Sequence, residues 1–160
     1  WAEQNLKRQT EIRGVSAERI IFAEKVPQSE HLARQRLADL FLDTFNYNAH
    51  TTASDALWAG LPLVTKLGKG FAARVAGSLL NAVGLPELVT ETEQDYEALI
   101  LELATNPTKL ANIKKKLATN RLTQPLFKTE LHTKHLEEGY QQAYQNYFDG
   151  NLPHTIIVPK

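Results

Sequence analysis

DLFLDTFNYNAHTTASDALWAGLPLVTK, residues 39–66, is the stretch of the sequence that decides the fold. It holds two apolar runs, 39–44 and 62–66, each typical of a strand covered on both faces. Between them, a helix is predicted from about Thr51 to Trp58, and Gly60 ends it. A strand, a helix and a strand with short connections predict a βαβ unit with two parallel strands.

The same alternation continues on both sides of this unit. Further strands are predicted at 19–22 and 87–90, and helices at 3–14, 29–38, 70–84, 93–106, 107–122 and about 128–148. We therefore expect one α/β domain over residues 1–160, with βα units in 1–92 and a helical segment in 93–160. Its core is a Rossmann-like parallel sheet with helices on both faces, and it ends in long helices.

Composition excludes several classes of function. Lys and Arg total 18 and Asp and Glu total 18, so no net charge favours nucleic acid or an anionic membrane as a partner. The absence of cysteine excludes disulfides, thiolate metal sites and cysteine nucleophiles. His132 and His135 lie on a polar helix with no third ligand indicated, so no metal site is expected. No apolar run reaches the roughly 18 residues of a membrane span, and we expect a cytoplasmic protein.

Ligands of open parallel sheets bind beyond the carboxyl ends of the strands, where the helix at Thr51 begins. A phosphate or diphosphate would suit this helix start, because the first amides of the helix and the positive end of its dipole lie there. The hydroxyls of Thr51 and Thr52 add donors, and so does His50. A capping box formed by Thr52 and Asp55 explains the same residues without a ligand. The residues alone leave both interpretations open.

A second candidate lies one βα unit earlier. His31 and Arg34 share one face near the start of the helix at 29–38. An imidazole can stack on a planar base, and a guanidinium can donate to a carbonyl. A solvated helix face with an incidental histidine is the alternative.

The last helix carries an apolar, aromatic-rich stripe. Its members are Leu131, Leu136, Tyr140, Tyr144, Tyr147 and Phe148. Either the stripe packs on the sheet of this domain, as amphipathic helices usually do, or part of it docks onto a neighbouring domain.

Taken together, these motifs resemble those of a known family. The segments that carry the resemblance are RIIF, VPQSEHLARQRLADLFLDT, NAHTTASDALWAGLPLVT, AARVAGSLL, LELATN and PLFKTELHTKHLEEGY, which cover nearly the whole chain. They are similar to the C-terminal part of the catalytic region of O-linked N-acetylglucosamine transferases, glycosyltransferase family 41, in a bacterial-type homologue. The combination of His-Thr-Thr-x-x-Asp with Leu-Trp-Ala-Gly-x-Pro is the specific part of the match.

The resemblance implies a GT-B enzyme with two Rossmann-like domains that usually follow tetratricopeptide repeats. Such enzymes transfer GlcNAc from UDP-GlcNAc to Ser or Thr of proteins, with inversion and without a metal or other cofactor. This chain would be the C-terminal, UDP-sugar-binding domain, truncated at its N-terminus. Its expected partners are the UDP-sugar, the N-terminal Rossmann-like domain, the repeats and a protein acceptor.

The resemblance also implies roles for eight residues. The family residues at the diphosphate are matched by His50, Thr51 and Thr52, and the acid that holds the ribose is matched by Asp55. At the uracil, His31 matches the histidine that stacks on the base, and Arg34 matches an arginine beside it. Val26 matches a position whose backbone contacts the base. Gln28 stands where animal members have a lysine near the nucleotide. Because a neutral amide supplies no charge, the sugar of the donor is less well determined than UDP.

The family's essential lysine and catalytic histidine lie outside the matched segments. We therefore expect no catalytic residue in this chain and no transfer by the chain alone. Two alternatives stay open: a catalytically degenerate UDP-sugar-binding regulatory module, and another GT-B enzyme, such as an epimerase, that uses a different nucleotide sugar.

Overall fold

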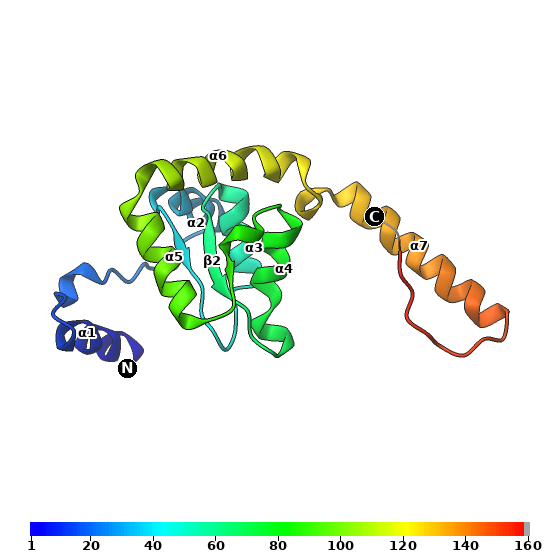
Figure 1. Cartoon of the computed structure of the whole chain (residues 1–160), viewed down its shortest axis with the longest axis horizontal. Helices are drawn as coiled ribbons and strands as arrows, with labels where there is room; N and C mark the ends of the chain where they lie inside the picture. Colours follow the sequence, from blue (N-terminus) through cyan, green and yellow to red (C-terminus); the bar gives the residue numbers. More distant parts are fainter. Residues whose placement is uncertain (159–160) are drawn as a thin grey trace. The chain divides into compact units, whose positions relative to one another are not determined.

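The computed structural model describes residues 1–158, which divide into two compact units (Figure 1). The first unit runs from Trp1 to His31 and the second begins at Leu32. That residues 1–160 form one domain stays a prediction.

The first unit contains helix α1 (Ala2–Ile12), the 3-10 turn η1 (Ala17–Arg19) and most of helix α2 (Gln28–Arg34). The strand predicted at 19–22 is wrong: Arg19 ends η1, and the residues from 20 to 27 form no regular structure. A strand needs a neighbour to pair with and a face to cover, and Ile21 is 87% exposed. An apolar β-branched run is therefore not sufficient for a strand here.

A parallel sheet lies at the centre of the second unit. Its strands are β1 (Phe41–Leu42), β2 (Leu63–Lys66) and β3 (Val89–Thr90), in the order β1-β2-β3. Phe41 pairs with Leu63, and Thr65 pairs with Val89. The predicted parallel arrangement is confirmed, although β1 and β3 are shorter than predicted. The 3-10 turns η2 (Gln35–Leu37) and η4 (Pro86–Leu88) occupy part of the chain before them.

Helices cover both faces of this sheet, as predicted. Helix α3 (Thr51–Ala59) joins β1 to β2, while the turn η3 (Phe71–Ala73) and helix α4 (Val75–Ala82) join β2 to β3. Figure 1 shows α3 and α4 on one side of β2 and helix α5 (Glu93–Thr105) on the other. Helix α6 (Pro107–Thr123) packs on α5 and α3. The residues that fill the space between these layers and are fully buried include Leu57, Leu63, Leu80, Leu85, Leu88, Leu103 and Leu117.

Gly60 ends α3 as the sequence predicts. It has a φ of 94°, in the left-handed region that favours glycine, and the amide of Leu61 donates to the carbonyl of Ala56 at 2.8 Å. From α6, Arg121 Nη1 donates to the carbonyl of Trp58 at 2.6 Å. The carbonyls of Ala56 and Trp58 near the end of α3 thus have partners, and α3 is fixed to α6.

The last helix, α7 (Thr129–Phe148), follows the 3-10 turn η5 (Pro125–Phe127) and contacts it. None of its residues is buried, and Tyr140 and Tyr144 are each 67% exposed. The apolar stripe therefore does not pack on the sheet in this structure. None of the helices in the described part of the chain is long and apolar enough to cross a membrane.

Helix α5 is attached to the end of β1 by a tyrosine. Tyr96 Oη donates to the backbone carbonyl of Asp43 at 2.8 Å, and its ring meets the ring of Phe45 edge-on, with centroids 5.0 Å apart. Burial, and to a lesser degree the negative charge of Asp43, raise the pKa of Tyr96. Both effects favour the neutral hydroxyl that donates this bond.

We predict that Leu57→Ala lowers the free energy of unfolding by about 2–5 kcal/mol, because it leaves a cavity between α3 and the sheet. Leu101→Ala is the matched control: Leu101 lies on α5 but is 57% exposed, so about 0.5 kcal/mol or less is expected. Urea unfolding followed by circular dichroism measures both. Equal losses in the two variants would contradict the proposed core.

The raised pKa of Tyr96 predicts a loss of stability at alkaline pH. Its contribution is complete below the unfolded pKa of about 10 and is lost as pH rises through the higher folded pKa. The free energy of unfolding should therefore fall less steeply above about pH 10 in Tyr96→Phe than in the wild type. Tyr140→Phe, a change at an exposed tyrosine, is the control and should keep the wild-type slope. Parallel curves for Tyr96→Phe and the wild type would refute this prediction.

Candidate functional site

A hollow of about 490 Å³ lies in the second unit, where β1 ends and α3 begins. This is the carboxyl edge of the parallel sheet, where the sequence places a ligand. The hollow is lined by Phe41, Leu42, Asp43, Thr44, Tyr47, Asn48, Ala49, His50, Thr51 and Thr52. Three of the eight predicted site residues, His50, Thr51 and Thr52, are thus brought together at one hollow.

The first turn of α3 presents unsatisfied donors at this hollow. His50 is the N-cap, and its side chain makes no capping bond. Thr51 and Thr52, the first two residues of the helix, are exposed. The first bond of the helix is donated by the Ser54 amide to the His50 carbonyl, so within the described residues the amides of 51–53 have no protein acceptor. These amides, two hydroxyls and the positive end of the dipole suit an anion.

The alternative interpretation, a capping box formed by Thr52 and Asp55, is excluded with Thr52 as the N-cap. Thr52 lies inside the helix, one residue past its start, so its hydroxyl cannot act as the N-cap. The same Thr-x-x-Asp spacing does form a cap at α5, where Thr92 Oγ1 accepts a bond from the amide of Asp95 at 3.0 Å. The spacing alone therefore does not decide between a cap and a ligand-binding helix start.

The imidazole of His50 is held on three sides. Nε2 lies 3.3 Å from the carbonyl oxygen of Ala72, the ring stacks on Tyr47 with centroids 4.7 Å apart, and Phe71 meets it edge-on at 6.1 Å. Because a carbonyl oxygen only accepts, Nε2 carries the hydrogen of this bond. Nδ1 is therefore the nitrogen that is left for a ligand.

Asp43 holds the loop that leads into α3. Its side chain is 5% exposed, and Oδ1 accepts from the amides of Thr44 at 2.9 Å and Ala49 at 2.7 Å. Oδ2 accepts from Thr65 Oγ1 at 2.6 Å, which joins the loop to β2. The carboxylate is thus fully engaged with the protein.

Asn48 holds the same loop from the other side. Asn48 is 1% exposed. Its backbone amide donates to the carbonyl of Ala72, and its side-chain Nδ2 donates to the carbonyl of Thr44, both at 2.8 Å. Oδ1 has no partner among the described residues.

Sequence reasoning missed seven residues of the hollow, among them the polar residues Asp43, Thr44, Tyr47 and Asn48. A signal was present for two of them: an acid directly after an apolar strand, and an asparagine two residues before His50, the N-cap, are groups that satisfy the amides of a loop.

The other five predicted site residues lie elsewhere. Val26, Gln28 and His31 belong to the first unit; Val26 and His31 are partly buried, and Gln28 is the exposed first residue of α2. Arg34, the last residue of α2, and Asp55 on α3 belong to the second unit and are partly buried. Neither of these two lines the hollow. The roles implied for the five residues stay predictions.

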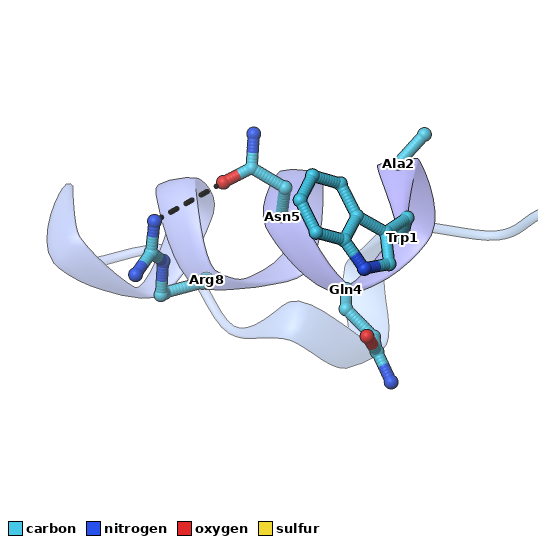
Figure 2. Close-up of a pocket in the computed structure, with 5 residues that line it drawn as sticks. All are labelled: Trp1, Ala2, Gln4, Asn5 and Arg8. Carbon is cyan, nitrogen blue, oxygen red and sulfur yellow. Dashed lines mark hydrogen bonds between the residues drawn. The ribbon is translucent and has the colours of Figure 1, made fainter.

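A second hollow, of about 660 Å³, lies along α1 in the first unit, between Trp1 and Arg8. Figure 2 shows that its lining comes from one helix, and that the Arg8 guanidinium is turned toward Asn5, whose Oδ1 accepts its bond at 3.2 Å. Trp1 is fully exposed. Although this hollow is larger, it offers no converging donors, so the hollow at α3 is the better candidate site. In the part of the chain that the structure describes, no three His, Asp or Glu side chains are grouped to hold a metal.

Comparison with known proteins adds to this geometry. The family model of glycosyl transferase family 41 matches residues 1–136. A probable UDP-N-acetylglucosamine–peptide N-acetylglucosaminyltransferase of Arabidopsis thaliana is 40% identical over 147 residues, 91% of this chain and 15% of the relative. The UDP-N-acetylglucosamine–peptide N-acetylglucosaminyltransferase of Caenorhabditis elegans is 36% identical over 148 residues, 92% of this chain and 13% of the relative.

Among solved structures, a mutant of the O-GlcNAc transferase of Thermobaculum terrenum superposes with a TM-score of 0.71 at 34% identity. The match covers 82% of this chain and 26% of that chain. The sequence thus spans a small part of the relatives it matches. From the family model, the relatives and this structure, we conclude that the chain belongs to glycosyl transferase family 41.

Proposed function

We propose that this chain is the nucleotide-sugar-binding part of an enzyme that transfers GlcNAc from UDP-GlcNAc to Ser or Thr of proteins. The observation that carries the proposal is the uncapped first turn of α3, which opens on a hollow at the carboxyl edge of the sheet. Two relatives are UDP-N-acetylglucosamine–peptide N-acetylglucosaminyltransferases by name, one of them a probable one, which supports the choice of donor and acceptor.

The nucleotide contacts follow from the geometry and from the family resemblance. The diphosphate binds to the amides at the start of α3 and to the hydroxyls of Thr51 and Thr52. His50 adds a donor, Nδ1–H, when its ring carries a proton on both nitrogens, since Nε2–H is bonded to the Ala72 carbonyl. The resemblance assigns the ribose to Asp55 and the uracil to His31, Arg34 and the backbone of Val26. Gln28 is close to the nucleotide in this assignment, and its neutral side chain bears on the choice of sugar.

In an inverting transfer, the oxygen of the acceptor hydroxyl attacks the anomeric carbon from the face opposite the diphosphate and the bond from this carbon to the diphosphate breaks. The hydroxyl gives its proton to a base outside this chain, and UDP leaves. Negative charge grows on the leaving diphosphate as the bond to the sugar breaks. Donors fixed by a helix start stabilise this charge without rearranging during the reaction. We propose that α3 supplies this stabilisation, with no metal, and that catalytic groups come from outside this chain.

The parent protein, in this proposal, contains an N-terminal Rossmann-like domain and tetratricopeptide repeats and acts on protein acceptors in the cytoplasm. In this proposal, donor groups at the start of α3 and in the loop before it hold UDP. The acceptor protein must also bind close to this site. We therefore propose that the acceptor is bound by those other parts of the protein.

Thr52→Ala should weaken UDP binding by about tenfold in the full-length protein, because a hydrogen bond to a charged group is lost. Binding of uridine, which has no phosphate, should not change. Thr108→Ala is the matched control: Thr108 is also the exposed second residue of a helix, α6. Isothermal titration calorimetry with UDP and uridine measures all three proteins.

Three outcomes of this titration are informative. Loss of UDP affinity in Thr52→Ala alone supports a diphosphate at α3. Equal affinities in Thr52→Ala and Thr108→Ala would place the diphosphate elsewhere. No UDP binding by the wild-type protein would refute the proposed function.

The full-length protein should convert UDP-GlcNAc and an acceptor peptide into UDP and a glycosylated peptide, whereas the 160-residue chain alone should show no turnover. Mass spectrometry of the products distinguishes transfer from epimerisation and from hydrolysis of the donor. Turnover by the isolated chain would show that a catalytic group lies within it, contrary to the proposal.

A further inference from the structure

We propose that Asp43 is a positioning residue for the diphosphate: it fixes the first turn of α3 by holding the amide of Ala49. The proposal rests on the proposed function, since it assumes that this turn binds the diphosphate. Asp43 itself would not touch the ligand.

The contacts of Asp43 connect three parts of the second unit. It directly follows β1, its Oδ1 accepts from the amides at both ends of the loop, Thr44 and Ala49, and its Oδ2 accepts from Thr65 on β2. All three distances lie between 2.6 and 2.9 Å, as expected for bonds to an ionised carboxylate. A buried carboxylate is costly unless it is bonded in this way, so the arrangement is strongly specified.

Ala49 is the residue that carries this constraint to the ligand site. It lies directly before His50, the N-cap, and two residues before the first exposed amide of α3. The Asp43–Ala49 bond therefore sets the direction in which the chain enters the helix. Donors that bind a transition state lose much of their effect when displaced by about 1 Å, so the direction matters for binding and for transfer.

The charge of Asp43 argues against direct contact with the ligand. A carboxylate at the edge of a diphosphate site repels the anion unless its charge is directed elsewhere. Here two amides and one hydroxyl of the protein take it up. Asp43 thus contributes to the site by fixing the positions of the groups that donate to it, and not by contact with the ligand.

Thr65 provides a way to disturb this geometry without touching the loop. Thr65→Val keeps the shape of the fully buried side chain but removes the donor to Asp43 Oδ2, while Thr65→Ser keeps the donor. Thr90→Val is the matched control, because it removes another buried threonine hydroxyl, which donates to the Thr65 carbonyl at 3.0 Å and does not meet Asp43.

The experiment is calorimetric titration of the full-length variants with UDP and with uridine, together with their melting temperatures. We expect Thr65→Val to weaken UDP binding about fivefold without changing uridine binding, and Thr65→Ser to restore it. Thr90→Val should leave both affinities unchanged. Asp43→Asn should keep UDP affinity within about twofold, because its oxygen still accepts from both amides and its NH₂ donates to Thr65 Oγ1.

Four results would overturn the proposal. Equal UDP affinities in Thr65→Val and Thr90→Val would mean that Asp43 stabilises the fold only, as would a lower melting temperature with unchanged affinity. A loss in Asp43→Asn as large as in Thr65→Val would mean that charge, and not geometry, matters. No UDP binding by the wild-type protein would refute the proposed function itself, and the role of Asp43 with it; this result is distinct from the other three.

Discussion

The need to satisfy the polar groups of the loop at the end of β1, where Asp43 and Asn48 are buried, shapes this site. β1 has two residues, and its ladder to β2 ends when the amide of Asp43 donates to the carbonyl of Val64. Beyond that point the backbone groups of the loop have no strand to pair with, and buried backbone groups require partners. The carboxylate of Asp43 supplies them at both ends of the loop, and Asn48 supplies others. The start of α3 depends on these bonds.

The same constraint explains how a chain without net charge could form the proposed anion site. Positive and negative side chains are equal in number, so no long-range field draws an anion to the molecule. The donors at the hollow are backbone amides and hydroxyls, whose dipoles act only at short range and only when oriented. The fold therefore has to orient them, and the loop held by Asp43 and Asn48 does so.

Short-range sequence patterns predict much of the fold, but they do not predict the contacts that hold the site. Gly60 ends α3, and Pro107 lies at the start of α6, because each acts through its own backbone geometry. The run at 19–22 has the composition of a strand, but pairing is not a local property, and the prediction failed. The place of Asp43 directly after an apolar strand is visible in the sequence, but its bond to Thr65 is not. Thr65 is 22 residues away and is brought close by the register of β1 and β2.

The starts of α5, α6 and α3 differ in how their first amides are bonded. At α5 the hydroxyl of Thr92 accepts from the third amide of the helix, and at α6 Asn106 Oδ1 does the same for the amide of Lys109. Each of these two helices thus caps one amide of its own first turn. At α3 the N-cap is a histidine whose ring is turned to the carbonyl of Ala72, so its side chain leaves the first amides to another acceptor. Thr-x-x-Asp occurs at both α5 and α3, and only the residue that precedes the helix, with the loop that places it, separates the two outcomes.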